Sequence, residues 1–156
     1  MIELHIPGRG IHHIDHLALD FNGTLAVDGI LIQSAADQLQ ELAACLEIHV
    51  ITSDTHGSAR TQLAGLPIRL TILNGDHHTD EKSKFIKELG ADSVIAIGNG
   101  SNDAAMLQAA VIGIVVIQHE GAAAEAIQKA DLVFTQITHA LEAIQKPERL
   151  IASLRK

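Results

Sequence analysis

The sequence predicts a three-layer α/β domain, with a mostly parallel central sheet between two layers of helices. Short β-rich segments alternate with segments of helical periodicity along the 156 residues, which is typical of consecutive βαβ units. Two of these segments, VIAI at residues 94–97 and IVVI at residues 114–117, contain no polar residue, as expected for strands covered on both faces. The length suits one domain over residues 1–156.

The strands are predicted from short apolar runs bounded by turn residues. An N-terminal strand is expected first, and the later runs are expected to form the parallel sheet. The predicted strands are residues 2–6, 16–21, 47–52, 68–73, 93–98, 111–117 and 131–135. Residues 23–31 lie between the second strand and the first helix, and we expect them to form a small β flap.

The helices are predicted from apolar residues that recur every three to four positions. In the first of them, Ala36, Leu39, Ala43 and Leu46 form one apolar stripe, which is expected to pack on the sheet. The last helix is expected to break before Pro147, because proline cannot continue a helix. The predicted helices are residues 33–46, 57–65, 80–89, 102–110, 121–129 and 137–154.

Composition excludes several functional classes. The net charge is −8 and the eleven Lys and Arg residues are scattered, so no basic surface for nucleic acid is expected. Cys45 is the single cysteine and cannot form an intrachain disulfide, and its position predicts a packed core thiol. No signal peptide or apolar run of membrane-spanning length is present, so we expect a cytoplasmic protein without membrane contact.

Two similar acidic segments each follow a predicted buried strand. The segment DFNGTL at residues 20–25 starts with Asp20 at a strand end, and Gly23 in the following turn permits close backbone approach to an anion. The segment GNGSND at residues 98–103 repeats this layout and ends with Asp103. Ligands of an open parallel sheet bind outside the carboxyl ends of its strands, so both segments are expected to line one crevice.

Two further segments supply a hydroxyl and an amine to the same crevice. VITSD at residues 50–54 places Thr52 and Ser53 at a strand end, and the spacing K-x-x-x-I-x-x-L places Lys82 at the start of a helix. A carboxylate can attack phosphorus in line, while a lysine and a hydroxyl neutralise and hold the phosphoryl oxygens. Together the residue types indicate phosphoryl chemistry.

In this order, the four segments resemble the motifs of the haloacid dehalogenase (HAD) superfamily of phosphohydrolases, in particular the phosphorylation domain of P-type ATPases and its soluble relatives. The resemblance implies a Rossmann-like HAD fold and an aspartyl-phosphate formed on Asp20. It implies a small phosphorylated substrate or phosphate as the ligand. The implied catalytic residues are Asp20, Asn22, Thr52 and Lys82, the phosphate-binding residues are Thr52, Ser53, Lys82 and Gly23, and the Mg²⁺ ligands are Asp20, Asn22 through its main-chain carbonyl, Asn99 and Asp103.

The sequence departs from the family pattern at two positions. The first family motif is D-x-D-G-T and the fourth is G-D-G-x-N-D, but this chain has Asn22 and Asn99 in place of the second acid in each. An amide at position 22 can neither protonate a leaving group nor activate water, and the loss of a general acid-base typically costs about 10² to 10⁴ in rate. We therefore expect slow hydrolysis of small phosphate esters. The alternative is a catalytically degenerate, regulatory protein that binds phosphate or a protein partner.

The spacing of the motifs leaves no room for a cap domain, which the family inserts between the first and second or second and third motifs. Exclusion of water normally assists this chemistry, and capless relatives often assemble. We therefore expect a homo-oligomer or a macromolecular partner, with association through the apolar residues of the flap segment: Leu25, Val27, Ile30, Leu31 and Ile32.

Other interpretations remain open for several residues. Asp20 and Asp103 are also good helix or turn caps, Ser53 and Asp54 are candidates to cap the next helix, and Lys84 and Lys87 compete with Lys82. Ten histidines are many for this length, and a metal-binding module is a third functional class. Surface positions explain the histidines better, because neighbours on a strand point to opposite faces. The histidines considered are His12, His13, His16, His77 and His78.

Overall fold

A parallel sheet of six strands forms the centre of the computed structural model, which describes residues 1–54 and 57–156. The strand order is β10-β9-β8-β3-β6-β7, so the first strand of this sheet along the chain lies in its interior. Every residue of β8 and β9 is buried, in agreement with their lack of polar residues. The strands are β3 (His16–Leu19), β6 (Glu47–Thr52), β7 (Arg69–Ile72), β8 (Val94–Gly98), β9 (Ile112–Val116) and β10 (Leu132–Phe134).

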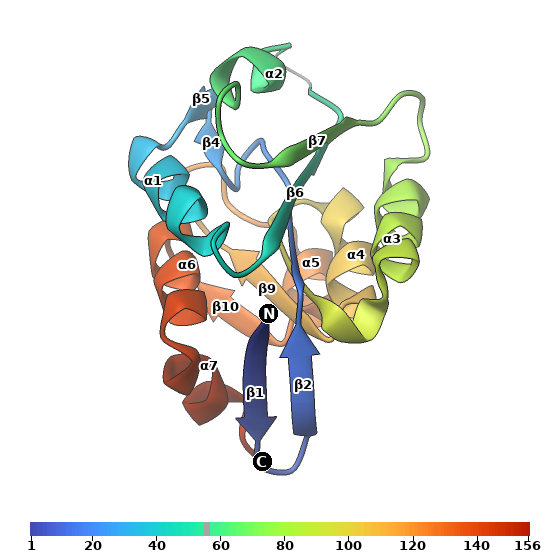
Figure 1. Cartoon of the computed structure of the whole chain (residues 1–156). Coiled ribbons are helices and arrows are strands. Elements are labelled where there is room, and N and C mark those ends of the chain that lie inside the picture. Colours follow the sequence, from blue (N-terminus) through green and yellow to red (C-terminus); the bar gives the residue numbers. More distant parts are fainter. Residues whose placement is uncertain (55–56) are drawn as a thin grey trace.

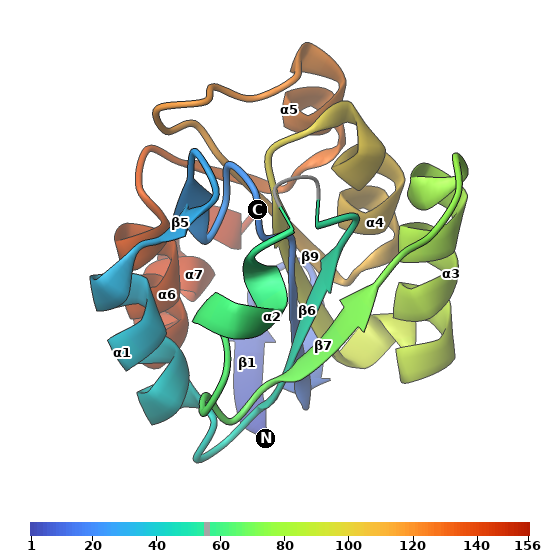
Figure 2. The same ribbon diagram turned by 90° about the horizontal axis from the view of Figure 1, so that it is seen from above.

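Helices cover both faces of this sheet, which gives the predicted three-layer α/β architecture (Figures 1 and 2). One face carries α1 (Gln33–Leu42), α6 (Ile137–Gln145) and α7 (Pro147–Leu154), and the other carries α3 (His78–Leu89), α4 (Ala104–Ala109) and α5 (Ala124–Lys129). Residues of β3 alternate between the two cores: Leu17 and Leu19 pack under α1 and α6, while Ala18 packs on the other side.

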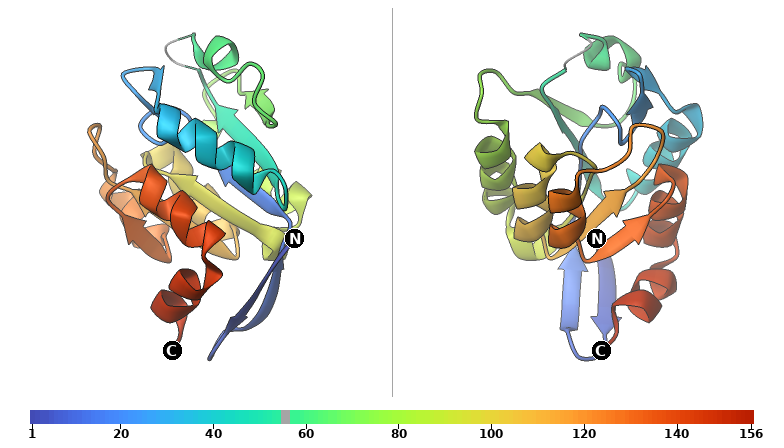
Figure 3. Two further views of the ribbon diagram at one scale, coloured as in Figure 1. Left: turned by 60° about the vertical axis from the view of Figure 1, so that its left-hand side comes forward. Right: turned by 180° about the vertical axis from the view of Figure 1, so that it is seen from behind.

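Two small antiparallel hairpins lie at opposite ends of the sheet. The flap, β4 (Ala26–Val27) and β5 (Ile30–Leu31), lies near the carboxyl ends of the strands, as the sequence predicts. Short helix α2 (Ala59–Gln62) lies beside it, and the Leu31 N–H donates to Gln62 Oε1 at 2.6 Å. The other hairpin, β1 (Ile2–Ile6) and β2 (Gly10–Ile14), projects from the opposite end, next to the C-terminus (Figure 3).

Element boundaries depart from the prediction mainly at helix ends. The predicted helix 57–65 is shortened to α2, and that predicted at 33–46 ends with α1 at Leu42. Cys45 lies beyond this end and is exposed, so the prediction of a packed core thiol is wrong. The predicted break before Pro147 is confirmed, since Pro147 begins α7. Strand β2 was not predicted, because its sequence GIHHI pairs only with β1 and has no continuous apolar run. Among the described residues, no helix has the length and apolar character needed to cross a membrane.

Candidate active site

Three predicted site residues meet in one buried ion-pair cluster at the carboxyl ends of the strands. Lys82 Nζ lies 2.8 Å from Asp20 Oδ1 and 2.7 Å from Asp103 Oδ1. Asp20 follows β3, Lys82 lies in the second turn of α3, and Asp103 ends the 3₁₀ turn Ser101–Asp103 after β8. Lys82 and Asp103 are fully buried, whereas 10% of the Asp20 side chain is exposed. Within this cluster, Asp20 is therefore the group that a ligand can reach.

Burial distinguishes Lys82 from the two neighbouring lysines of α3 that were also candidates for the site. Lys84 lies on the exposed side of α3, where its ammonium is 3.7 Å from Glu88, and Lys87 is also exposed. The helical repeat places Lys82 on the same face as the buried Ile86, so its side chain points toward the sheet. The sequence spacing therefore selected the lysine that reaches the acidic segments.

The loop after β8 is organised by the Asp103 carboxylate. Asp103 Oδ2 accepts the backbone N–H groups of Asn99 and Gly100, each at 2.9 Å. Gly98 packs against the same side chain, and a Cβ on Gly98 would lie 2.5 Å from Asp103 Cγ. The segment GNGSND thus needs glycine at its first position, because any side chain there would displace the acid that holds Lys82.

Burial and the close charges shift the pKa values of Asp20 and Lys82 in the cluster. Burial, reinforced by the charge of Asp103, raises the pKa of Asp20 to about 7, although Lys82 and the Phe21 N–H oppose this shift. Burial alone would lower the pKa of Lys82, but its two carboxylate partners outweigh burial and raise that pKa. Two carboxylates thus share one ammonium, which leaves an excess negative charge in the site when both are ionised.

The two asparagines have different environments. Asn22 Oδ1 is buried and has no hydrogen-bond partner among the residues that the structure describes. Asn99 Oδ1 accepts the Thr24 hydroxyl at 3.2 Å, and Asn99 Nδ2 donates to the Gly121 carbonyl at 3.1 Å. Asn99 therefore ties the flap to the loop before α5, while Asn22 keeps a free acceptor atom. Gly23 packs so closely on Asn99 that a Cβ would lie 2.3 Å from Nδ2.

The second-motif residues lie at the end of β6, which is paired in parallel with β3. Thr52 is buried, and its Oγ1 accepts the Asp54 N–H at 3.0 Å. Asp54 Oδ1 accepts the N–H groups of Ser58 and Ala59 at 3.0 and 2.9 Å, so Asp54 caps α2 as the alternative interpretation predicted. Ser53 is partly buried between Thr52 and Asp54.

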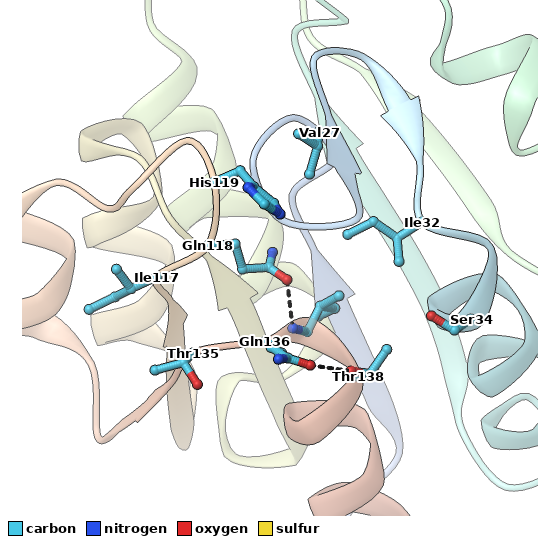
Figure 4. Close-up of a pocket in the computed structure, with 10 residues that line it drawn as sticks. Val27, Ile32, Ser34, Ile117, Gln118, His119, Thr135, Gln136 and Thr138 are labelled. Atoms are coloured by element: carbon cyan, nitrogen blue, oxygen red, sulfur yellow. Dashed lines mark hydrogen bonds between the residues drawn. The ribbon is translucent and has the colours of Figure 1, made fainter.

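Gln118, which sequence reasoning missed, fastens the flap to the rest of the molecule. Its Nε2 donates to the carbonyls of Thr24 at 3.0 Å and Gly23 at 3.3 Å, and its Oε1 accepts the Ile137 N–H at 2.8 Å (Figure 4). A cavity of about 570 Å³ adjoins these contacts, and its lining does not include Asp20, Lys82 or Asp103. No local motif marks Gln118, because its role depends on three segments that are distant in sequence.

The donor set fits a hard divalent cation. The carboxylates of Asp20 and Asp103 and the oxygens of Asn22 are the oxygen ligands that Mg²⁺ prefers. Burial, with the neighbouring Asp103 charge, raises the pKa of Asp20, and a cation beside the two carboxylates would favour their ionised form. The unpartnered Asn22 Oδ1 offers a further acceptor. Asn99 fits less well than the carboxylates, because its amide oxygen is neutral and already accepts the Thr24 hydroxyl, and its amide nitrogen is a donor that cannot bind a cation.

Comparison with known proteins relates the chain first to an archaeal sequence. No family model matches. The chain is 40% identical over 78 residues to the uncharacterized protein MJ0073 of Methanocaldococcus jannaschii, a match that covers 47% of this chain and 84% of that protein. The chain belongs to one family with this archaeal protein. It is also 30% identical over 139 residues to a "Probable copper-exporting P-type ATPase" of Archaeoglobus fulgidus; this match covers 86% of the chain but only 16% of the ATPase.

Solved structures define the fold. A 3-deoxy-D-manno-octulosonate 8-phosphate (KDO8P) phosphatase from Moraxella catarrhalis, in complex with magnesium, phosphate and KDO, superimposes with a TM-score of 0.71 at 19% identity, over 92% of this chain and 95% of that one. A cobalt-bound phosphatase of the same kind from Haemophilus influenzae gives 0.70 at 17% identity, over 87% and 86%. A Legionella pneumophila structure assigned to HAD subfamily III A gives 0.67 at 18% identity, over 89% and 87%. The chain therefore has the HAD fold.

Proposed function

We propose that this chain is a phosphohydrolase that depends on a divalent cation and uses Asp20 as its nucleophile. The observation that carries the proposal is the buried Asp20–Lys82–Asp103 cluster, with Asp20 as its accessible member. The cluster lies at the carboxyl ends of parallel strands, where this class of fold binds ligands. The similarity to phosphatases that bind phosphate and a sugar acid supports a small phosphate ester as substrate.

The proposed reaction has two displacements at phosphorus. The Asp20 carboxylate attacks the phosphorus, the bond to the ester oxygen breaks, and the departing alkoxide takes a proton from water. A second water then attacks the phosphorus of the aspartyl-phosphate, which releases inorganic phosphate and restores the carboxylate. Lys82 and the Thr52 hydroxyl stabilise the phosphoryl oxygens, together with the backbone at Ser53. The Gly23 N–H already donates to the Ala26 carbonyl at 2.8 Å, so Gly23 contributes close backbone approach in the turn and not a donor.

Mg²⁺ is the cation we propose, held by Asp20, Asp103 and the main-chain carbonyl of Asn22, with Asn99 as the weakest candidate ligand. When bound, it would neutralise charge on the phosphoryl oxygens. The magnesium in one similar phosphatase and the cobalt in another support dependence on a divalent cation.

Asn22 makes this a slow enzyme in our proposal. Its amide cannot exchange a proton with the leaving group or with the attacking water. Its unpartnered Oδ1 can still accept a hydrogen bond from water and so orient it. Water must then supply and remove the protons, and the aspartyl-phosphate is expected to be long-lived.

A second candidate function, phosphate binding without turnover in a regulatory role, is favoured by Asn99. Its amide is fully used in holding Thr24 and Gly121, so this position serves the flap rather than the chemistry. Such a protein would keep the anion-binding residues and lose hydrolysis.

The two functions are separated by assaying hydrolysis of p-nitrophenyl phosphate and a panel of small phosphate esters with Mg²⁺ and with chelator. The assay compares the wild type with Asp20→Asn and with Asp28→Asn, an exposed flap position that serves as the matched control. We expect Mg²⁺-dependent hydrolysis in the wild type and in Asp28→Asn, and none in Asp20→Asn. Saturable phosphate binding without any hydrolysis would favour the binding protein, and activity retained in Asp20→Asn would exclude the proposed nucleophile.

A further inference from the structure

A second polar cluster lies at the other end of the sheet, where β3 and β6 begin. His16 is paired in register with Glu47 on the neighbouring strand, and His49 follows two residues later on β6. Partners in register and residues two apart share one face of a sheet, so all three side chains project to the same side. His16 Nδ1 and His49 Nε2 are 3.2 Å apart, and Glu47 Oε2 lies 3.8 Å and 3.9 Å from them.

We propose that His16, Glu47 and His49 form a transition-metal site of the Zn²⁺ class. Zinc binds histidine nitrogen and carboxylate oxygen at about 2.0–2.2 Å, so two ligands of a tetrahedral ion are roughly 3.3–3.5 Å apart. The His16–His49 separation of 3.2 Å is slightly shorter than this ligand–ligand distance, and the two separations from Glu47, 3.8 and 3.9 Å, are slightly longer. Small side-chain rotations would bring all three atoms to the distance that zinc requires. This is the one such group of His, Cys, Asp and Glu among the residues that the structure describes.

The cluster combines a rigid member with accessible ones, as a metal site requires. The His49 ring is buried and packs edge-on against Phe85 of α3 with ring centroids 5.5 Å apart, so its nitrogen has a fixed position. The Glu47 side chain is 52% exposed, and both His16 and Glu47 line a cavity of about 460 Å³. The lining of this cavity does not include His49. The His16 side chain is 19% exposed, so an ion and a water as the fourth ligand can reach the cluster from solvent past this side chain and that of Glu47.

One competing cation lies nearby. Arg69 Nη2 is 3.5 Å from Glu47 Oε2, and its side chain is 71% exposed, so it can move into solvent when an ion takes its place. Removal of this guanidinium should therefore tighten metal binding. Among the described residues, Arg69 and the two histidines are the side chains that pair with Glu47.

The proposed site is separate from the cluster around Asp20. The two lie at opposite ends of β3, and four residues of strand span roughly 13 Å. Of the five histidines considered from the sequence as possible metal ligands, His16 alone belongs to this site. His12 Nε2 lies 3.1 Å from the Arg9 carbonyl, and His13 Nε2 lies 2.8 Å from Glu3 Oε2, so both are engaged on the β1–β2 hairpin.

The test measures Zn²⁺ binding to the whole chain, freed of metal by a chelator, in competition with a chromophoric indicator. We expect one ion per chain at this site, and an affinity lowered at least about tenfold in Glu47→Gln and in His16→Gln. Glu47→Gln changes a half-exposed side chain and should leave the fold intact, which circular dichroism checks. Arg69→Gln should bind more tightly than the wild type.

Two controls locate the ion. Asp28→Asn, an exposed surface control, and the double variant His12→Gln/His13→Gln should bind Zn²⁺ as the wild type does, with excess Mg²⁺ present to occupy the cation position proposed at Asp20. Co²⁺ gives a second readout, because a tetrahedral site should show intense visible absorption that is lost in Glu47→Gln. Absence of saturable binding, equal affinity in Glu47→Gln and His16→Gln, or loss of the same ion in either control would overturn the proposal.

Discussion

At position 22 the difference between a carboxylate and an amide is one atom, yet it decides whether the site has a proton donor. The buried, unpartnered Asn22 Oδ1 shows that the surroundings leave an oxygen acceptor free at this position. Restoring a carboxyl group there should therefore restore proton transfer without repacking. In the proposed enzyme, this position limits turnover.

Asn22→Asp should raise the rate of Mg²⁺-dependent phosphate ester hydrolysis by about 10² to 10⁴, the usual contribution of a general acid-base. Steady-state kinetics over a panel of esters measures it. Asn74→Asp is the matched control, because Asn74 also precedes a glycine but has an exposed side chain. A folded Asn22→Asp variant that binds Mg²⁺ and still hydrolyses nothing would support the binding protein instead.

Deamidation is a natural source of the same change. Asn22 and Asn99 each precede a glycine, whose lack of a Cβ leaves the next backbone nitrogen free to attack the amide. Activity in a wild-type preparation should therefore be compared with the fraction of Asp at position 22, measured by peptide mapping. We expect the activity and the fraction of Asp at position 22 to increase in proportion during storage.

The raised pKa of Asp20 makes a prediction for stability. The pKa is about 7 in the folded protein against an ordinary value of 3.8, so the folded state binds more protons between these values. The contribution of Asp20 to the free energy of unfolding is therefore fully present below pH 3.8, and it is lost as the pH rises through about 7. With chelator present, Asp20→Asn should unfold several degrees above the wild type at pH 8 and much closer to it at pH 5.

Thermal unfolding followed by circular dichroism checks this difference, with Asp28→Asn as the matched control. Asp28 is exposed, so its replacement should not produce a pH-dependent gain. If Asp20→Asn lowers the unfolding temperature at pH 8, the prediction is wrong. The attraction of Lys82 to the second carboxylate would then outweigh the burial of Asp20 and the repulsion between the two carboxylates.

At the scale of elements, the flap is held by few contacts. Gln118 joins it to the loop after β9 and to the start of α6 (Figure 4). Gln118→Glu keeps the acceptor for the Ile137 N–H but turns the donor into an oxygen that repels the carbonyls of Thr24 and Gly23. We expect the free energy of unfolding to fall by about 1–3 kcal/mol. Amide hydrogen exchange in residues 23–31 should become faster.

The control for this change is Gln136→Glu, because Gln136 is exposed and its Oε1 accepts a long hydrogen bond, at 3.4 Å, from the Thr138 hydroxyl. Its unfolding temperature and flap exchange should match those of the wild type. Unchanged exchange in Gln118→Glu would mean that the remaining contacts, among them Thr24–Asn99 and Leu31–Gln62, hold the flap without Gln118.

The comparison of prediction with structure is most favourable where a local signal is strong. The apolar runs that became β8 and β9 and the order of the four motifs placed Asp20, Lys82 and Asp103 correctly at one end of the sheet. The contacts that the sequence did not predict depend on how the strands and loops pair in the folded chain. The contact of His16 with His49 depends on the register of β3 against β6, and Gln118 acts only through segments folded around it.

At the scale of the whole molecule, the flap and the cavity beside it form the apolar surface nearest the site. Of the flap residues predicted to mediate association, Leu25 is instead part of the core, because it packs beneath the flap. Ile30 is 68% exposed, and Val27 and Ile32 line the cavity together with Ile117, which is 37% exposed (Figure 4). A contact over this surface would shield the adjoining site from water.

We therefore predict that the chain associates through the flap and that Ile30→Lys shifts it toward the monomer. Sedimentation velocity over a range of concentrations measures this, with concentration taken from refractive index because the chain has no Trp and no Tyr. Val133→Lys is the matched control, since Val133 is 51% exposed on β10, an edge strand that is itself able to pair with a second copy. If Val133→Lys alone dissociates the protein, association runs along the sheet edge and leaves the site uncovered. If Ile30→Lys dissociates it and also slows hydrolysis, the neighbouring subunit contributes the exclusion of water that this chain's own short flap cannot provide.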